Sequence, residues 1–458
     1  MDLPSLSPRG ATSTRGIFYG ILSGEKSRYV SRIDEEPRQT KDEGPARTGD
    51  VIDVRIDALA PGGDAVGRQE GGPHGGRATF VALAAPGERV TARLGRAKAR
   101  VAWGELVAIV QPSPVRVAPP CPYFGRCGGC QWQHVTLEAQ RAAKRAIVER
   151  ALGAERAPVA ALETPVPAGT PYRDRARVSV GPAGELGFRA RRDHRIVDVE
   201  RCLLLTPPAA AALAAVRRAA RGWPAGTEID LQAGNDGVHV SVRVGPASAT
   251  SPPRRLAAAS ALEAWRDAGV VGVRVDQDVA GAADVDVSEP GGPPLRVPAG
   301  GFAQVGRTAN AALVRVVRDR LPPEPGRIVE LYAGSGNFTR HLVATGATVE
   351  ASDGDRGAVE RGRRNVPAAR WSVGPPRPEA VNAGTVVVDP PRAGLDDGHL
   401  RAALGARRRL LYVSCDPQTL ARDARRLQRE GFVLTEVVAL DLMAHTFHVE
   451  VVATFDRP

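Results

Sequence analysis

The stretch Leu411-Tyr-Val-Ser-Cys-Asp-Pro-Gln-Thr-Leu-Ala-Arg-Asp423 joins the end of a buried strand to the beginning of a helix. The apolar run that ends at Val413 predicts a strand of a parallel sheet. Asp416 and Pro417 form a helix-start signal, because proline is tolerated at the first helical position. Cys415 is therefore expected at the carboxyl end of a strand, where open α/β sheets bind ligands. The helix N-terminus beside it favours a thiolate, so Cys415 is a candidate nucleophile, although an isolated cysteine is more often an inert core residue.

The composition predicts a protein that binds nucleic acid and does not span a membrane. The chain has 458 residues and a formal net charge of +11, which favours a polyanionic partner. Its length predicts roughly three domains of about 150 residues each. No apolar run approaches the roughly 18 residues of a membrane span, and the N-terminus lacks the pattern of a secretory signal. We therefore expect a cytoplasmic monomer whose five cysteines form no disulfides.

The first part of the chain divides into a disordered extension, residues 1–48, and a small β-barrel, residues 49–112. The extension mixes Ser, Pro, Gly, Arg and Glu without periodicity. Short β segments then alternate with Gly-rich turns, which is typical of an OB-like barrel that binds nucleic acid. Four basic residues near Trp103 suit phosphate contact beside a stacking surface, or form a solvated basic face: Arg93, Arg96, Lys98 and Arg100.

The central domain, residues 113–295, begins with the cysteine motif Cys121-Pro-Tyr-Phe-Gly-Arg-Cys127-Gly-Gly-Cys130. In a reducing compartment such closely spaced cysteines indicate zinc or an iron–sulfur cluster. The fourth ligand is Cys202 or, for zinc, His134, and the spacing leaves the metal open. A helix is predicted over residues 137–152, with Lys144 on its polar side, and alternating strands follow, which together indicate an α+β domain.

Residues 296–458 have the pattern of a Rossmann-like α/β domain. The strand Arg327–Leu331 leads into the turn Tyr332-Ala-Gly-Ser-Gly-Asn-Phe338 and a helix, and the next strand ends at Asp353. A glycine turn followed by an acid at the end of the next strand is typical of nucleoside-cofactor sites. The third glycine of the dinucleotide motif is absent. We therefore favour S-adenosylmethionine, whose ribose hydroxyls Asp353 can bind.

Further polar residues follow the later strands of this domain. Asp389 ends an apolar strand and precedes Pro-Pro-Arg392, and Glu450 borders the final strand, where an acid is either solvated or functional. Because the carboxyl ends of parallel strands meet at one edge, we expect Asp353, Asp389 and Cys415 to face one crevice.

Residues 49–458 resemble the family of RNA uridine C5 methyltransferases, and in particular its bacterial 23S ribosomal RNA members with a TRAM barrel and an iron–sulfur cluster. The resemblance rests on the Cys-x5-Cys-Gly-Gly-Cys run, the Asp-Pro-Pro-Arg segment, the Ser-Cys-Asp-Pro-Gln-Thr-Leu-Ala-Arg-Asp segment and the terminal His-Val-Glu. It implies S-adenosylmethionine-dependent methylation of uridine at carbon 5 in 23S ribosomal RNA, through a covalent adduct between a cysteine and uracil carbon 6.

The resemblance also implies roles for individual residues. Cys415 would be the nucleophile, and the chemistry then requires a base, for which Glu450 is the candidate. The ligands of a 4Fe-4S cluster would be Cys121, Cys127, Cys130 and Cys202. The residues that contact the methyl donor or target would be Gln304, Tyr332, Asn337, Asp353 and Asp389.

The chain departs from the family pattern at three places. Gly306 stands where the family commonly has asparagine, the segment that begins at Trp371 lacks the polar residue expected near the cofactor, and Ala444 replaces a proline. Three other functions stay open from the residues alone: a transfer-RNA uridine methyltransferase, a non-catalytic RNA-binding protein and a redox-active iron–sulfur protein.

Overall fold

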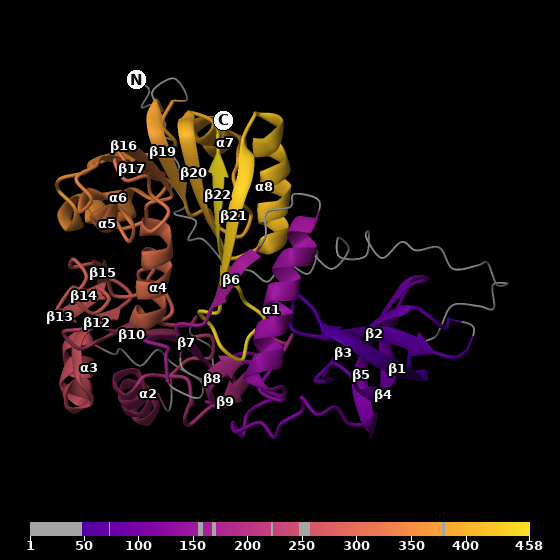
Figure 1. The fold of residues 1–458 in the computed structure, drawn as a ribbon. Coiled ribbons are helices and arrows are strands. Elements are labelled where there is room, and N and C mark those ends of the chain that lie inside the picture. Colours follow the sequence, from indigo (N-terminus) through magenta and orange to yellow (C-terminus); the bar gives the residue numbers. More distant parts are fainter. Residues whose placement is uncertain are drawn as a thin grey trace, which may run out of the picture.

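The computed structural model describes residues 48–72, 74–153, 159–166, 171–220, 223–246, 257–377 and 381–458. Figure 1 shows an N-terminal barrel at one side of the molecule, a central sheet and a C-terminal sheet layered with helices. The disorder predicted for residues 1–48 falls almost entirely outside the described residues. No helix within the described ranges is long and apolar enough to cross a membrane.

The barrel is formed by five short strands that close on themselves in the order β1-β2-β3-β5-β4. Alternate side chains of these strands, such as Val54 and Ile56, point into a common core. Trp132, which follows the barrel in the chain, is fully buried in the same core. The predicted barrel is confirmed, and its strands are β1 (Val51–Leu59), β2 (Ala65–Glu70), β3 (Ala78–Ala82), β4 (Arg89–Ala97) and β5 (Val101–Gln111).

The central region is a seven-stranded sheet with the order β13-β12-β11-β10-β7-β8-β9. Helices α2 (Pro207–Ala219) and α3 (Ala258–Trp265) pack on it through alanine-rich faces, and η3 (Arg266–Ala268) follows α3. A two-stranded sheet, β14 (Asp284–Asp286) and β15 (Arg296–Pro298), leads out of this region. The seven strands are β7 (Arg175–Val180), β8 (Leu186–Arg189), β9 (Ile196–Asp198), β10 (Glu228–Ala233), β11 (Val238–Arg243), β12 (Val270–Val275) and β13 (Asp278–Gly281).

The C-terminal sheet has eight strands in the order β18-β17-β16-β19-β20-β22-β21-β6. The first five run parallel, and β22 lies antiparallel between β20 and β21. The strands are β6 (Val159–Glu163), β16 (Arg327–Leu331), β17 (Thr348–Asp353), β18 (Arg370–Val373), β19 (Ala383–Val388), β20 (Ala406–Ser414), β21 (Val433–Leu440) and β22 (Glu450–Asp456).

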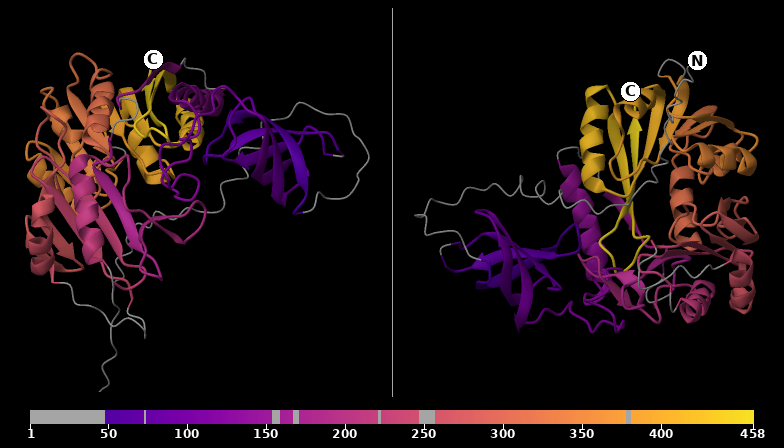
Figure 2. Two further views of the ribbon diagram at one scale, coloured as in Figure 1. Left: turned by 90° about the horizontal axis from the view of Figure 1, so that it is seen from below. Right: turned by 180° about the vertical axis from the view of Figure 1, so that it is seen from behind.

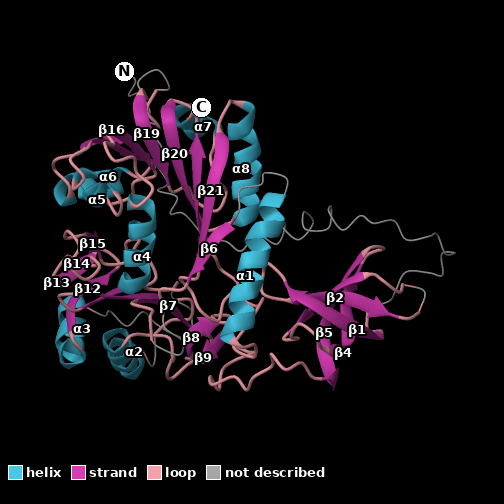
Figure 3. Cartoon of the chain, viewed as in Figure 1, coloured by secondary structure: helices cyan, strands magenta, loops and turns pink. Residues whose placement is uncertain are grey.

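Helices of the C-terminal region connect its strands and cover the sheet (Figure 3). The helix that follows Cys415, α8, carries its apolar residues on one buried face, as its sequence period predicts. The helices are α4 (Arg307–Arg318), α5 (Thr339–Val343), α6 (Arg356–Asn365), α7 (Asp397–Ala403) and α8 (Pro417–Arg429). The predicted Rossmann-like domain is confirmed.

Helix α1 (Leu137–Leu152) connects the three parts of the molecule, and its bounds are those predicted. It packs against α8, against β6 and against β1 of the barrel. The two views of Figure 2 show the barrel projecting from the rest of the molecule beside this helix. After α1 the chain enters the C-terminal sheet as β6, which pairs in parallel with β21. Residues of the predicted central domain therefore complete the C-terminal sheet.

Candidate active site and cysteine pocket

Three residues of the glycine turn after β16 have the left-handed backbone conformation, which residues other than glycine rarely adopt. Tyr332, Gly334 and Gly336 have positive φ angles of 60°, 56° and 101°. The carboxylate of Asp353, at the end of β17, accepts a hydrogen bond from Gly334 N at 2.8 Å through one oxygen. Its other oxygen accepts one from Asp355 N, also at 2.8 Å. Asp353 therefore ties the glycine turn to the next strand and holds both at one edge of the sheet.

Asn337, at the end of this turn, is held by a second asparagine. The side-chain amides of Asn310 and Asn337 exchange hydrogen bonds of 2.8 and 2.9 Å. Asn310 is buried on α4 and also donates to Glu289 at 3.3 Å. Glu289 in turn pairs with Arg340, so a buried network from the central region reaches a residue expected to contact the methyl donor. Sequence reasoning missed Asn310, which lies within the apolar pattern of α4.

Tyr332 and Gln304 lie at two further sides of this edge. The ring of Tyr332 stacks on that of His399, with ring centroids 4.0 Å apart. Gln304 is partly exposed in the segment that leads into α4.

The departures from the family pattern have local structural causes. A Cβ atom at Gly306 would lie 2.1 Å from the carbonyl oxygen of Tyr172, so no larger residue fits there. The ring of Trp371 packs against Gly362 and lies under Gly336, where it supports the glycine turn. The carbonyl oxygen of Ala444 accepts a hydrogen bond from the Tyr172 hydroxyl at 3.0 Å.

Cys415, Glu450, Asp389 and Arg392 form one electrostatic group at the ends of β19, β20 and the beginning of β22. Burial, with a smaller contribution from Glu450, raises the pKa of the Cys415 thiol to about 12, and Arg392 acts in the opposite direction. Burial also raises the pKa of Glu450 well above its usual range, with a further contribution from Asp389. For Asp389 itself, burial raises the pKa to about 7. The four residues come from three separate segments and lie close enough in the fold to influence one another electrostatically.

The predicted thiolate at Cys415 is wrong for the protein without substrate. The helix N-terminus lies where the sequence predicts it, since α8 begins at Pro417 and Asp416 caps it by accepting from Gln418 N and Thr419 N. Burial beside two carboxyl groups outweighs that favourable position, so the pKa of Cys415 lies well above neutrality.

Arg392 is held at the site by the loop that follows β19. Its guanidinium lies 3.1 Å from Nδ1 of His448. Burial lowers the pKa of His448 to about 3, so the ring is neutral at pH 7 and can accept a hydrogen bond from Arg392. The backbone carbonyl of Arg392 accepts from the Thr419 hydroxyl at 2.9 Å, which ties the loop to α8. Sequence reasoning did not identify His448 as part of this group.

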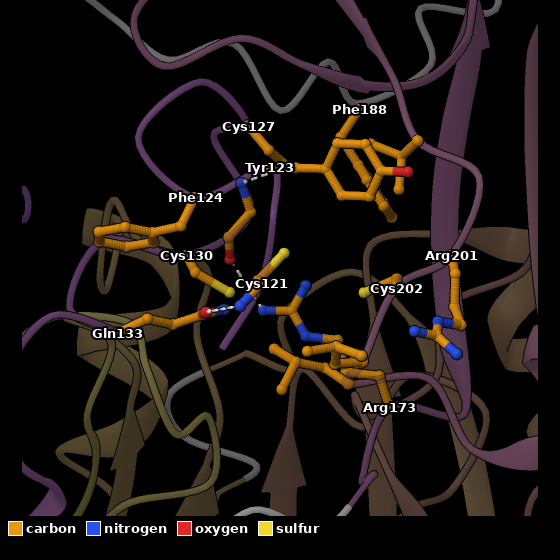
Figure 4. Close-up of a pocket in the computed structure, with 14 residues that line it drawn as sticks. Cys121, Tyr123, Phe124, Cys127, Cys130, Gln133, Arg173, Phe188, Arg201 and Cys202 are labelled. Carbon is orange, nitrogen blue, oxygen red and sulfur yellow. Dashed lines mark hydrogen bonds between the residues drawn. The ribbon is translucent and has the colours of Figure 1, made fainter. Parts of the chain in front are cut away.

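The four cysteines of the predicted metal site line one pocket (Figure 4). Cys121, Cys127 and Cys130 come from the motif after the barrel, and Cys202 comes from the loop after β9. Burial raises the pKa of Cys127 to about 11 and also raises that of Cys130, which Arg173 opposes. In Figure 4 the guanidinium of Arg173 lies between the motif cysteines and Cys202. The pocket thus combines four thiols with the positive charges of Arg173 and Arg201.

The glycines of the motif allow the cysteine loop to fold closely on β8. A Cβ atom at Gly128 would lie 2.9 Å from the carbonyl oxygen of Arg189, to which Gly128 N donates. Gly129 N donates to the sulfur of Cys127 at 3.4 Å, a contact that suits a thiolate ligand.

His134, the alternative zinc ligand, does not line this pocket. Its Nε2 lies 3.0 Å from the carbonyl oxygen of Ala84 in the barrel. Within the described part of the chain, no three His, Cys, Asp or Glu side chains are close enough to hold a single metal ion. The cavity enclosed by the pocket lining measures about 30 Å³.

The basic residues predicted beside Trp103 are exposed on β4 and the turn after it. The guanidinium of Arg96 lies 5.2 Å from the Trp103 ring centroid, and Phe80 stacks on the same ring. Cations beside a partly exposed aromatic ring suit contact with a nucleic-acid strand.

Lys144 does not lie on a solvated face, contrary to the sequence prediction. It is fully buried, and its ammonium group pairs with Asp441 in the loop between β21 and β22. Gln140, one turn earlier on α1, is also fully buried against that loop. The helical period alone placed Lys144 outside, because its partner lies some 300 positions away in the chain.

Comparison with known proteins agrees with this arrangement of a barrel and a methyltransferase-like sheet. Residues 45–107 match the TRAM domain, and residues 378–457 match the tRNA (uracil-5-)-methyltransferase family. The 23S rRNA (uracil(1939)-C(5))-methyltransferase RlmD of Chromohalobacter salexigens is 31% identical over 94% of this chain and 96% of its own. The protein of the same name from Alkalilimnicola ehrlichii is 33% identical over 84% of this chain and 93% of its own.

The fold also agrees with that of a solved enzyme. The tRNA (uracil-54, C5)-methyltransferase of Pyrococcus abyssi, in complex with S-adenosyl-L-homocysteine, superposes with a TM-score of 0.68. It covers 88% of this chain and all of its own, at 23% sequence identity. From the sequence identity to the bacterial relatives over nearly its full length, the chain belongs to the family of RNA uracil-C5 methyltransferases.

Proposed function

We propose that this protein methylates carbon 5 of a uridine in 23S ribosomal RNA, with S-adenosylmethionine as methyl donor and Cys415 as nucleophile. The observation that carries the proposal is the grouping of Cys415, Glu450, Asp389 and Arg392 beside the glycine turn that Asp353 holds. The near full-length similarity to proteins named as 23S ribosomal RNA methyltransferases favours that RNA over transfer RNA.

The chemistry requires both a nucleophile and a base. Carbon 5 of uracil is a weak nucleophile until a thiolate adds to carbon 6 and converts the ring to an enolate. S-adenosylmethionine would supply the methyl group as an electrophilic methylsulfonium: carbon 5 attacks the methyl carbon, the bond from that carbon to sulfur breaks, and S-adenosylhomocysteine leaves. A base removes the proton from carbon 5, the double bond between carbons 5 and 6 re-forms, and the carbon–sulfur bond to Cys415 breaks.

The residues of the site suit these steps. Glu450 is 7% exposed, and its raised pKa gives a carboxylate that holds a proton more strongly than an exposed one. Asp389, with a pKa raised to about 7, can present either a donor or an acceptor to the uracil edge near neutral pH. Arg392 offers positive charge to the enolate and lowers the pKa of Cys415. We propose that the methyl donor is contacted by Gln304, Tyr332, Asn337 and Asp353.

We further propose that Cys121, Cys127, Cys130 and Cys202 hold a 4Fe-4S cluster. Four thiols around one pocket are the usual ligand set of such a cluster, and Arg173 offsets negative charge that the ligands gain when they lose their protons. Anaerobically purified protein should contain iron and absorb visible light. The Cys202→Ser variant should lose both signals and His134→Ala should keep them, whereas zinc without iron would refute this assignment.

The barrel is proposed to hold RNA while the target base leaves its stack, at a cost of a few kcal/mol. We propose that the protein acts as a monomer in the cytoplasm, where ribosomal RNA is assembled.

A covalent-trapping experiment tests the catalytic residues. Wild-type protein with S-adenosylmethionine and RNA that contains 5-fluorouridine should form an adduct that survives denaturation, because fluorine blocks the loss of a proton from carbon 5. Cys415→Ala should form none. With unmodified RNA, Glu450→Gln should accumulate the methylated adduct, whereas Glu436→Gln, an acid on the adjacent strand that pairs with Arg320, should turn over normally. An adduct with Cys415→Ala, or rapid release by Glu450→Gln, would refute the roles assigned.

The target RNA is tested in cells. Deletion of the gene should remove 5-methyluridine from a position in 23S ribosomal RNA and leave transfer RNA unchanged. Loss from transfer RNA instead would replace the proposed substrate.

A further inference from the structure

The loop of residues 441–449 joins β21 to β22 and ends immediately before Glu450. Its position therefore decides where the carboxyl group of Glu450 lies. The loop contains His445, whose φ angle of +67° is unfavourable for a residue with a side chain. A backbone conformation of this kind persists only where surrounding contacts enforce it.

Gln140 of α1 supplies contacts of this kind. Its side-chain oxygen accepts a hydrogen bond of 2.9 Å from the backbone N–H of His445. Its side-chain nitrogen donates to the carbonyl oxygens of Trp132 and Val135 at 2.9 and 2.7 Å. Because Gln140 is fully buried, water cannot replace these bonds when the side chain is removed.

The segment before α1 forms hydrogen bonds with the carbonyl group of His445. The backbone N–H groups of Gln131 and Trp132 both donate to the carbonyl oxygen of His445, at 2.9 and 3.0 Å. Both the N–H and the C=O of the strained residue are therefore satisfied by the region around α1.

Two more buried side chains form an ion pair and hydrogen bonds with other residues of the loop. Lys144 pairs with Asp441 and donates to the carbonyl oxygen of Met443 at 2.9 Å. The Tyr172 hydroxyl donates to the carbonyl oxygen of Ala444 at 3.0 Å. Four of the first five residues of the loop are therefore held by side chains from outside the C-terminal sheet: Asp441, Met443, Ala444 and His445.

We propose that Gln140, together with Lys144 and Tyr172, is a positioning residue that holds the 441–449 loop so that Glu450 faces the proton on uracil carbon 5. The inference rests on the proposed function, because it takes Glu450 as the base and Cys415 as the nucleophile. Cys415 is placed by β20 and α8 and not by this loop. Loss of the contacts that hold the loop should therefore slow proton removal and adduct breakdown more than adduct formation.

The test compares these two stages in single-turnover reactions with radiolabelled S-adenosylmethionine and 23S ribosomal RNA. Gln140→Leu keeps the side-chain volume and removes the hydrogen bonds. It should slow release of methylated RNA by about tenfold and accumulate a methylated adduct that survives denaturation. Tyr172→Phe removes the hydrogen bond to Ala444 and a longer one of 3.4 Å from Arg173. It keeps the ring in place and should slow release about threefold.

The matched control is Gln232→Leu, which removes another buried glutamine, on β10, whose side chain donates to the carbonyl of Ala233. This variant should lose stability without accumulating adduct. A thermal melt and the rate of adduct formation with 5-fluorouridine RNA are measured for all variants. If Gln140→Leu and Tyr172→Phe release product at the wild-type rate, or if formation and release slow equally as stability falls, the positioning role is refuted.

The proposed function fails in a different way from this inference. If wild-type protein forms no adduct with 5-fluorouridine RNA, the covalent mechanism itself is wrong. If wild type forms the adduct and Glu450→Gln traps it, but Gln140→Leu does not, only the positioning role is lost.

Discussion

The strongest prediction concerns Asp423, a fully buried carboxylate on α8. One of its oxygens accepts hydrogen bonds of 2.8 Å from the Tyr412 hydroxyl and from the backbone N–H of Leu395. The other accepts from Arg422 at 2.9 Å. Asp423 therefore joins the strand before Cys415, the helix after it and the loop after Asp389.

The change Asp423→Ala leaves two buried donors without acceptors. Each unsatisfied buried donor costs about 1–3 kcal/mol, so the free energy of unfolding should fall by about 4 kcal/mol. Arg422 is partly exposed and can turn to water, so it adds little. Tyr412→Phe removes one donor and keeps the carboxylate, and it should cost only about 1 kcal/mol.

The measurement is denaturant unfolding followed by a probe in the C-terminal domain, together with the rate of adduct formation at Cys415. The matched control is Asp397→Ala on α7, whose exposed carboxylate pairs with Arg426 and should contribute less than about 1 kcal/mol. If Asp423→Ala is no less stable than Asp397→Ala, the buried network does not hold the site.

Three other predictions follow from the described contacts. Burial raises the pKa of Glu330 to about 8, so the protonated carboxyl group stabilises the fold below the unfolded pKa near 4.5, and this stabilisation is lost as the pH rises through 8. In urea unfolding across that range, the free energy of unfolding of Glu330→Gln should decline less steeply with pH than that of the wild type. An unchanged slope would contradict the assignment. Gly362→Ala normally favours a helix, but its Cβ would lie 2.2–2.6 Å from the Trp371 ring; thermal melts should show destabilisation that Trp371→Leu partly relieves, and a raised melting temperature for Gly362→Ala would contradict it. Arg96→Ala should weaken RNA binding and lower the slope of log K against log salt by up to about 0.9, as measured by salt titration of filter binding, if Arg96 contacts a phosphate; an unchanged slope would remove it from the interface.

Local signals in the sequence predicted the elements that carry the reaction. The helix over 137–152 and the strand–turn–helix around Cys415 have bounds set by capping residues and apolar period, which act over a few positions. β2 was missed, because Ala65–Glu70 has few apolar residues and gains its burial from barrel closure. Its formation depends on partners that no local pattern identifies.

Properties set by long-range contact could not be predicted in the same way. The sequence correctly brought Cys415 and Asp389 to one edge, because parallel strands share their carboxyl ends. Glu450 lies there at the beginning of the antiparallel strand β22. The sequence did not predict that burial raises the pKa of Cys415, since this depends on everything packed around the thiol. The buried positions of Gln140 and Lys144 follow from a loop near the other end of the chain.

The pairing of β6 with β21 has a consequence for how the chain is made. β6 leaves the ribosome early, while β21, its only neighbour in the described sheet, is among the last strands to be synthesised. The sheet therefore reaches its full width only when the chain is nearly complete, and distant pairings of this kind slow folding. A fragment that begins at residue 296 would leave the edge of β21 uncovered and open to pairing with another chain. The catalytic part of this protein is therefore not separable by cutting at the boundary between its sequence domains.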